Sequence, residues 1–363
     1  MENVVERGKR LGSDRKIADF KTKQKMDYAF KVKYAKVRAW EFYNHPEIDG
    51  NCYVAVGGLD SITLLQFLRS IHIDVPAVSV SVLEDKSIQE VHKQLGVKAL
   101  KPLKSKVQVI REFGWPVLSK EIAGKISLLQ NPSEKNATVR HAIITGETGA
   151  YGGYRTGTRM KLAQKWLEKF GGYENENEGV SYGKPDFLVS DKCCYYLKEK
   201  PCNDYAKESR RFPYMGLMAS EGGRRQKALM LNGCNYISPG TKRSCPFAIF
   251  SRQDLLQLAL DLNVPVPEIY GEIVRDADGT LRTTKAQRTG CSMCGFGIHL
   301  EKRPHRFDQL WSRNPGEWQM WMNHVMQDDD GEWYGWGHIL DYIGVEWRNP
   351  EKWEKTGEEK NHK

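Results

Sequence analysis

A pair of glycines between a short β-prone run and an apolar helix constrains this chain more than any other feature. Residues 53–56 are Tyr-Val-Ala-Val, Gly57 and Gly58 interrupt the run, and residues 61–70 carry apolar side chains at helical spacing. A buried strand, a glycine turn and an amphipathic helix in this order form the first half of a βαβ unit, the repeating element of parallel α/β folds. The segment therefore predicts an α/β fold class.

The strand–helix alternation continues after this unit. Residues 76–82 form a second apolar run, residues 87–95 have helical spacing, and residues 98–103 form a third short run. Further predicted elements are a strand at 187–189 and helices at 26–43, 226–231 and 254–261. Strands that alternate with helices favour a parallel sheet covered by helices.

The glycine turn also has the composition of an anion site. Residues 56–61, here called the glycine loop, are Val-Gly-Gly-Leu-Asp-Ser. Gly57 and Gly58 let backbone N–H groups approach an anion, and the following helix directs its positive end to the same place. Ser61 can donate its hydroxyl to a phosphate oxygen, and Asp60 can orient the loop or help to hold Mg²⁺. The alternative is a tight turn that needs glycine for its geometry alone.

A second segment combines small residues with charges suited to an anion. Residues 216–225 are Gly-Leu-Met-Ala-Ser-Glu-Gly-Gly-Arg-Arg. A guanidinium group can bind phosphate or sulfate through two hydrogen bonds, which makes Arg225 a candidate. Gly216 and Glu221 belong to the same segment. An exposed basic turn before a helix is the alternative interpretation.

Two pairs among the eight cysteines have metal-ligand spacing. Cys193 and Cys194 are adjacent, and Cys291 and Cys294 form a C-x-x-C turn flanked by glycines. Two thiolates at this spacing can converge on one metal, and four thiolates suit an iron–sulfur cluster or zinc. Cys245 competes with Cys193 for the fourth position.

The other three cysteines are Cys52, Cys202 and Cys234. We expect them to be small buried hydrophobic residues, which is the commonest role of a free cysteine.

In these motifs the chain resembles the ATP-pyrophosphatase and phosphoadenylyl sulfate (PAPS) reductase superfamily. The glycine loop is similar to the S-G-G-x-D-S loop of that superfamily, with Val56 in place of the first serine. Residues 216–225 are similar to its G-x-R-x-x-E-S-x-x-R stretch, where Met218 and Gly222 depart from the pattern. The resemblance runs from about Cys52 to Gly297 and leaves both ends of the chain uncovered.

The cysteine pattern resembles the iron–sulfur branch of the same superfamily. A Cys-Cys pair followed much later by T-G-C-x-x-C is similar to the 4Fe–4S binding pattern of assimilatory adenylyl sulfate reductases and of DNA-phosphorothioation sulfurtransferases. The resemblance implies that Cys193, Cys194, Cys291 and Cys294 hold a 4Fe–4S cluster, with structural zinc as the alternative.

The resemblance also implies a fold and an activity. The fold would be an adenine nucleotide alpha hydrolase-like, Rossmann-like domain. The enzyme would bind ATP with Mg²⁺ and cleave the α–β phosphate bond to adenylylate a substrate for sulfur transfer, with Asp60, Ser61 and Arg225 as catalytic residues. Two alternatives stay open: a PAPS reductase that uses a partner's thiol, and a non-catalytic nucleotide- or nucleic-acid-binding accessory protein. No cysteine follows Cys294, so the chain lacks the reductases' C-terminal nucleophile, which favours ATP.

Composition divides the chain into three predicted segments. Residues 1–48 form a basic helical extension, residues 49–300 the nucleotide-binding domain, and residues 301–363 a tryptophan-rich helical appendage. The net charge of +9 favours a polyanionic partner, such as a nucleotide, tRNA or DNA, although a solvated basic surface explains it equally well. Candidates for contact with a nucleic-acid backbone are Lys98, Lys101, Lys104, Lys106, Lys302, Arg303 and Arg306.

Two further expectations concern the cellular context. No apolar stretch approaches the roughly 18 residues that span a bilayer, and the N-terminal residues lack a secretory signal. We therefore expect a cytoplasmic protein with no membrane partner. The sulfur chemistry implied by the resemblance would need a sulfur or thiol donor protein as a partner.

Overall fold

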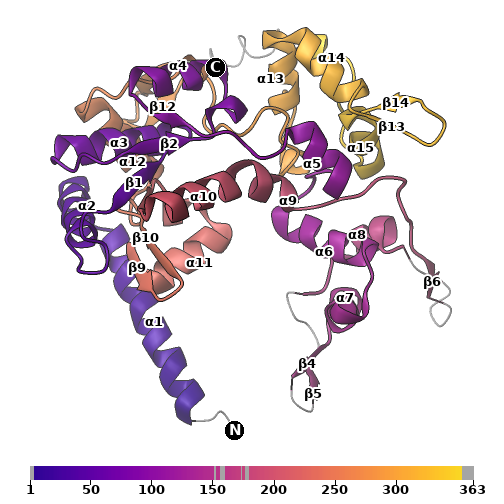
Figure 1. Cartoon of the computed structure of the whole chain (residues 1–363), viewed down its shortest axis with the longest axis horizontal. Helices are drawn as coiled ribbons and strands as arrows, with labels where there is room; N and C mark the ends of the chain where they lie inside the picture. Colours follow the sequence, from indigo (N-terminus) through magenta and orange to yellow (C-terminus); the bar gives the residue numbers. More distant parts are fainter. Residues whose placement is uncertain (1–3, 151–152, 156–159, 173, 176–179, 354–363) are drawn as a thin grey trace. The chain divides into compact units, whose positions relative to one another are not determined.

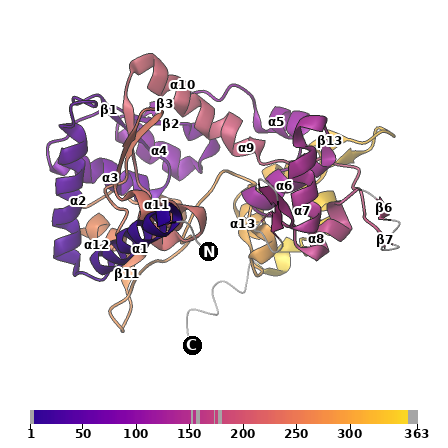
Figure 2. The same ribbon diagram turned by 90° about the horizontal axis from the view of Figure 1, so that it is seen from below.

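The computed structural model of the chain describes residues 4–150, 153–155, 160–172, 174–175 and 180–353. The chain forms two compact units, each assembled from two separate stretches (Figures 1 and 2). Unit 1 comprises Met1–Pro102 and Lys198–Cys291, and unit 2 comprises Leu103–Leu197 and Ser292–Lys363. Unit 1 contains the glycine loop, and unit 2 contains every tryptophan of the chain except Trp40.

A six-stranded sheet forms the centre of unit 1, in the order β3-β2-β1-β8-β10-β9. Its strands are β1 (Cys52–Ala55), β2 (Ala77–Ser79), β3 (Lys98–Ala99), β8 (Phe212–Met215), β9 (Asn235–Ser238) and β10 (Thr241–Ser244). All neighbouring pairs are parallel except β9 and β10, which form a hairpin. The chain runs from β1 to β2 and β3 on one side, whereas β8 lies on the other side of β1. The predicted α/β class with a mostly parallel sheet is confirmed.

Helices surround this sheet. They are α1 (Val4–Gln24), α2 (Tyr28–Tyr43), α3 (Leu59–Ser70), α4 (Lys86–Gln94), α10 (Lys200–Ser209), α11 (Gly223–Asn232) and α12 (Arg252–Asp261). Side chains fix several starts: Asp27 accepts the Phe30 N–H at 2.7 Å, and Ser251 and Asp254 form a capping box on α12. The helices predicted over 26–43, 61–70, 87–95, 226–231 and 254–261 are confirmed to within a few residues at each end. Helix α1 lies within the extension predicted to be basic and helical at 1–48, and α10 was not predicted.

The core of unit 1 joins the sheet to its helices. Apolar side chains of α3, including Leu64, Phe67 and Leu68, are fully or almost fully buried. The Phe67 ring lies 5.3 Å from the ring of Phe247, measured between centroids. A buried ion pair between Lys31 Nζ and Asp254 Oδ2, 2.8 Å apart, ties α2 to α12. Breaking such a pair leaves an uncompensated buried charge, so it strongly constrains where α2 lies.

Unit 2 is mainly helical. Its helices are α5 (Lys106–Phe113), α6 (Lys120–Gln130), α7 (Ala137–Thr145), α8 (Gln164–Phe170), α9 (Lys192–Cys194), α13 (Arg306–Arg313), α14 (Pro315–Asn323) and α15 (Trp336–Ile343). Short hairpins pair β4 (Thr148–Ala150) with β5 (Gly153–Arg155), β6 (Glu174–Asn175) with β7 (Val180–Ser181), and β13 (Met326–Gln327) with β14 (Trp333–Tyr334). In unit 1, β11 (Ile273–Arg275) pairs with β12 (Leu281–Thr283) in the same way.

Two tryptophans at the centre of unit 2 join its two stretches. Trp115 and Trp336 are fully buried, and their ring centroids lie 4.8 Å apart. The predicted appendage from residue 301 onward therefore shares one core with residues 103–197. A helical segment this rich in aromatic side chains must bury them, and here the partner is an earlier part of the chain. The three-part division at residues 48 and 300 stays a prediction about domains.

One local prediction needs correction. The strand expected at 187–189 is reduced to a single bridge between Val189 and Trp115 in the described part of the chain. None of the described helices is long and apolar enough to cross a membrane.

Candidate functional site

The glycine loop lies where the order of the sheet reverses. β1 ends at Ala55, which is paired with Met215, the last residue of β8. Because the two strands are parallel, the segments that follow them leave the same edge of the sheet. In open α/β sheets this edge, at the point of reversal, is where ligands bind. The two predicted motifs, residues 56–61 and residues 216–225, both begin there.

Gly216 packs directly against the glycine loop. A Cβ atom at Gly216 would lie 2.9 Å from the carbonyl oxygen of Asp60 and 3.0 Å from Cα of Ser61. Both of these are backbone atoms, so they cannot move aside as a flexible side chain would. A Cβ at Gly58 would lie 2.3 Å from the Tyr270 hydroxyl oxygen, whereas Gly57 has room for one. Close approach therefore requires glycine at 216, whereas a Cβ at position 58 would displace the Tyr270 hydroxyl.

Hydrogen bonds within the loop leave two backbone donors available. Ser61 Oγ accepts the Gly57 N–H at 2.7 Å and donates to the Gly58 carbonyl at 3.0 Å. The Leu59 N–H donates to the Tyr270 hydroxyl at 3.1 Å. No side chain caps α3, and among the described residues the N–H groups of Gly58 and Asp60 have no acceptor. These two donors, at the positive end of α3, are available for an anion.

A guanidinium group holds the carboxylate of the loop. Arg252, in the first turn of α12, donates to Asp60 Oδ1 and to the carbonyl of Gln287, the latter at 3.0 Å. Burial raises the pKa of Asp60, and the charge of Arg252 opposes that shift. Asp60 is thus a half-buried carboxylate whose charge is balanced by Arg252.

A second carboxylate forms ion pairs with two guanidinium groups. Glu221, whose side chain is 8% exposed, accepts from Arg225 at 2.8 Å on one oxygen and from Arg288 on the other. Arg225 and Arg288 are 55% and 62% exposed, so both keep donors that face solvent. Glu221 and Arg288 also act on the charge of Asp60, which places the two carboxylates in one charged cluster.

All residues predicted for the nucleotide site therefore belong to unit 1 and follow the carboxyl ends of β1 and β8: Gly57, Gly58, Asp60, Ser61, Gly216, Glu221 and Arg225. The structure adds Arg252 and Arg288 to this cluster. Neither follows a recognisable motif in the sequence, because each is brought to the loop from a distant segment.

His92 binds the backbone of the glycine loop. Its Nε2 lies 2.8 Å from the Gly57 carbonyl oxygen, and its Nδ1 lies 2.9 Å from Ser81 Oγ. A carbonyl can only accept, so Nε2 carries the proton and Nδ1 accepts from Ser81. Burial lowers the pKa of His92, which keeps the ring neutral. The sequence offered no signal for this role beyond the position of His92 on the buried face of α4.

Glu84 and Lys198 connect the surroundings of the loop to the C-x-x-C turn. The nearly buried Glu84 carboxylate lies beside Gly57 and accepts from Lys198 Nζ at 2.6 Å. Lys198 also forms a hydrogen bond with the thiol of Cys291. Burial acts to lower the pKa of Lys198, but Cys291 and Glu84 outweigh it and raise the pKa above its usual range. The signal in the sequence was the position of Lys198, four residues after Cys194.

Two cations bind the backbone of the cysteine turn, residues 291–294. Lys106 is buried, and its Nζ donates to the carbonyl oxygens of Ser292 and Met293, the latter at 2.6 Å. Arg306 donates to the Cys294 carbonyl at 3.3 Å. Met293 has a φ of 51°, in the left-handed region, which closes the turn. Lys106 and Arg306 therefore place positive charge beside the backbone of the cysteine turn.

The predicted metal ligands are divided between the units. Cys291 ends a stretch of unit 1, whereas Cys193, Cys194 and Cys294 belong to unit 2. Within the described parts of the chain, no group of three or more histidine, cysteine, aspartate or glutamate side chains is arranged to hold a metal. The 4Fe–4S cluster and its zinc alternative therefore stay predictions.

The remaining cysteines differ in their environment. Cys52, Cys234 and Cys245 are buried, and burial raises the pKa of each thiol to about 12. Such thiols stay protonated and make poor metal ligands. Cys202 is only partly buried.

Most of the basic residues proposed for nucleic-acid contact have internal partners. Lys104, Arg303 and Arg306 each pair with a carboxylate of the same unit, and Lys106 binds the cysteine turn. Their charge is therefore largely neutralised within the protein.

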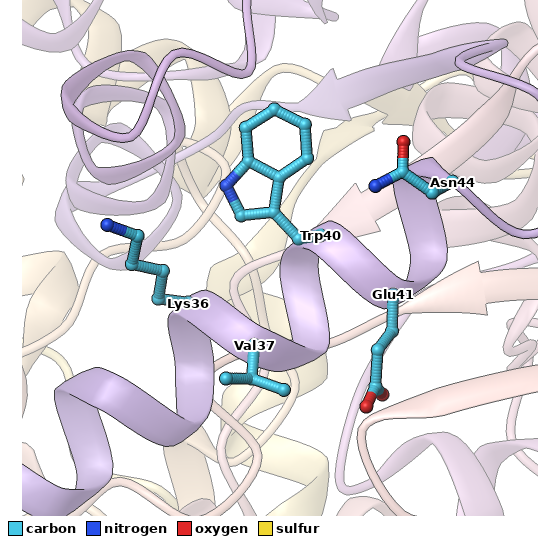
Figure 3. A pocket seen from close by; sticks show the side chains of 5 residues that line it. All are labelled: Lys36, Val37, Trp40, Glu41 and Asn44. Carbon is cyan, nitrogen blue, oxygen red and sulfur yellow. The ribbon is translucent and has the colours of Figure 1, made fainter.

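The described cavities lie away from these residues. One is lined by residues along α2: Lys36, Val37, Trp40, Glu41 and Asn44 (Figure 3). Another is lined by Arg69, His72 and Asp74. The candidate site is thus defined by the loop and its charges rather than by an enclosed pocket.

Comparison with known proteins yields only a remote likeness. No family model matches the chain, and no curated protein matches it. Among solved structures, the phosphoadenylyl-sulfate (PAPS) reductase from Candida auris, in a phosphate complex, matches with a TM-score of 0.35 and 12% identity. The match covers 72% of this chain and 93% of that one. A likeness this remote adds nothing to the assignment of the site.

Proposed function

We propose that this chain is a PAPS-reductase-like iron–sulfur enzyme that binds ATP or a related adenine nucleotide with Mg²⁺ at the glycine loop. It would cleave the α–β phosphate bond and adenylylate a substrate for sulfur transfer. The observation that carries the nucleotide part is the uncapped start of α3 at the reversal of the sheet, with the N–H groups of Gly58 and Asp60 free.

The cluster around the loop suits the transfer of an adenylyl group. A phosphate would bind the two free N–H groups, and Asp60 would help to hold Mg²⁺. Arg225 and Arg288 would stabilise the charge that develops on the leaving group. A substrate oxygen forms a bond to the α-phosphorus, the bond from that phosphorus to the bridging oxygen breaks, and pyrophosphate leaves. The substrate's proton passes to solvent. A hydrosulfide supplied by a donor protein could then displace AMP.

The cations at the cysteine turn support the iron–sulfur part of the proposal. Lys198 contacts Cys291, and Lys106 and Arg306 bind carbonyls of the turn. The cluster would be held by Cys193, Cys194, Cys291 and Cys294, and when bound it would supply a place to bind or relay sulfur.

Met218 favours ATP over a sulfated nucleotide. The reductase pattern has arginine at this position, whereas Met218 is 2% exposed and packs in the core of unit 1. The chain therefore lacks one cation that a sulfate group would need. This matches the lack of any cysteine after Cys294.

Calorimetry and pyrophosphate release test the proposal on protein purified without oxygen. Wild type should bind ATP with Mg²⁺, and Asp60→Ala should weaken that binding by about tenfold, the effect of losing one charged contact. Asp276→Ala is the matched control, because Asp276 pairs with Arg282 elsewhere in unit 1 at 2.9 Å. Release of pyrophosphate from ATP supports the proposal, and release of sulfite from PAPS identifies a reductase. ATP affinity that is the same in wild type and Asp60→Ala would rule out the loop as the site.

A further inference from the structure

We propose that α1 and α11 form a docking surface for the phosphodiester backbone of a nucleic acid. This α1–α11 surface is defined by the exposed cations Arg15, Lys16 and Lys21 of α1 and Arg225 and Lys227 of α11. It lies elsewhere than the basic residues predicted from the sequence, and it goes beyond the proposed nucleotide chemistry.

Positive charge is concentrated on these two helices. The sequence of α1 contains seven lysines and arginines against three carboxylates, and that of α11 contains three against none. The whole chain has a net charge of +9. The two helices therefore carry a large part of the excess. Among the α1 cations at positions 12–24, Lys23 alone pairs with a carboxylate of the described residues, Asp19, at 2.6 Å.

Burial of apolar side chains in the core does not explain why the chain has helix α1. Among its side chains at positions 12–24, which the structure describes, Phe20 alone is buried. A helix of this length spans about 32 Å, so one buried anchor leaves most of it facing solvent. A helix that is polar on all sides is not selected by burial. It also lacks the apolar face that an anionic membrane would require.

The α1–α11 surface begins at the candidate site. α1 packs along α11, and Figures 1 and 2 both show the two helices side by side. Arg225, in the first turn of α11, binds Glu221 in the charged cluster of Asp60. A polyanion bound along α1 could therefore present one of its groups to the nucleotide site. In this respect alone the inference rests on the proposed function.

The number of exposed cations along α1 and α11 indicates a nucleic acid rather than an acidic protein. Duplex DNA carries one negative charge about every 1.7 Å along its axis, so its backbone can meet successive cations along a straight helix. Each cation that contacts a phosphate releases a counterion, and binding becomes steeply dependent on salt.

Fluorescence anisotropy with labelled DNA and RNA duplexes of the same sequence, over a series of KCl concentrations, tests the inference on the full chain. The variant Arg15→Glu/Lys16→Glu/Lys21→Glu should lose about tenfold or more in affinity at low salt. Its log–log salt slope should become shallower by about 3, because each lost phosphate contact contributes about 0.9. The DNA and RNA arms distinguish the two sources of the backbone.

The matched control is Lys86→Glu/Lys93→Glu/Lys285→Glu, which changes the net charge by the same amount with three exposed lysines. Lys86 and Lys93 lie on α4, at the opposite end of the sheet from α11, and Lys285 follows β12. The control should keep the wild-type salt slope. Equal losses in both triple variants, wild type that binds neither duplex, or binding only to vesicles of anionic lipid would each overturn the inference.

The variant Asp60→Ala separates this inference from the proposed function. It should lose affinity for ATP and keep the wild-type affinity for the duplex. Duplex binding by a chain that does not bind ATP would contradict the nucleotide proposal alone, whereas ATP binding without duplex binding would contradict the docking surface alone.

Discussion

The glycine loop and the cysteine turn are both short backbone turns with cations beside them, but the cations have opposite effects. At the loop, Arg252 binds the side chain of Asp60, and backbone N–H groups stay free for an anion. At the turn, Lys106 and Arg306 bind the carbonyl oxygens, so backbone acceptors rather than donors meet charged groups. The loop is therefore suited to receive an anion, whereas the turn has positive charge placed beside its backbone.

The largest expected effect tests the turn. Serine in place of Cys194, Cys291 or Cys294 should remove most of the iron from anaerobically purified protein, because a cluster needs all four thiolates. Serine at Cys52 or Cys234 should leave the iron content unchanged, since both are buried non-ligands. Iron and sulfide analysis measures the result.

If all three serine variants retain iron, or if the wild type contains zinc alone, the iron–sulfur assignment of the cysteine turn is wrong. The turn would then be a structural staple whose cations stabilise the backbone.

The next effect tests how tightly the loop is packed. Gly216→Ala places a Cβ about 3 Å from backbone atoms of Asp60 and Ser61, and overpacking of this kind typically costs about 1–3 kcal/mol. Gly240→Ala is the control, because a Cβ there meets no atom within 4 Å. Urea unfolding and ATP calorimetry should show that the first variant loses both stability and affinity. If the two variants are equally stable, the backbone of Asp60 and Ser61 moves aside easily to admit the new Cβ.

The loop and the turn also differ in how far they could be predicted. The loop depends on local rules: a strand, two glycines and a helix that starts without a cap. Its second motif follows a neighbouring parallel strand, so the fold class is sufficient to bring Gly216 next to Asp60. The predicted cysteine ligands come from both units, and spacing along the chain contains no information about how distant segments meet.

The charged partners of the loop were missed for a related reason. Arg252 and Arg288 come from segments about 190 and 230 residues beyond the loop, and no pattern marks them. The bounds of helix α1 within the predicted helical extension were not predicted, because α1 has no apolar periodicity, which is the main signal for a helix. The same lack of an apolar face is what points to its role at the surface.

A pH titration tests the support beneath the loop. His92 is buried and neutral, and its pKa is lowered by burial, so below the unfolded-state pKa of about 6.5 the unfolded chain binds a proton that the folded chain does not. Stability should therefore fall as the pH drops below that value, with a slope that approaches about 1.4 kcal/mol per pH unit from this group. The variant His92→Gln should lose that part of the slope. Urea unfolding at several pH values gives the measurement, and identical slopes would show that His92 titrates alike in the folded and the unfolded chain.

The smallest expected effect concerns the Leu59 N–H, a backbone donor of the glycine loop that already has an acceptor. The Tyr270 hydroxyl accepts the Leu59 N–H at 3.1 Å and lies 2.6 Å from Thr289 Oγ1, so it occupies the place that an oxygen of an anion would take. The variant Tyr270→Phe keeps the ring in the core and frees a third N–H group at the start of α3. Since one hydrogen bond contributes about 1 kcal/mol, inorganic phosphate should bind roughly fivefold more tightly to the variant. Thr289→Val, which removes only the outer partner of the hydroxyl, should leave phosphate affinity near that of wild type. Weaker binding to Tyr270→Phe would instead show that the hydroxyl holds the loop in its binding conformation, and the loop would then depend on side-chain support as much as the cysteine turn does.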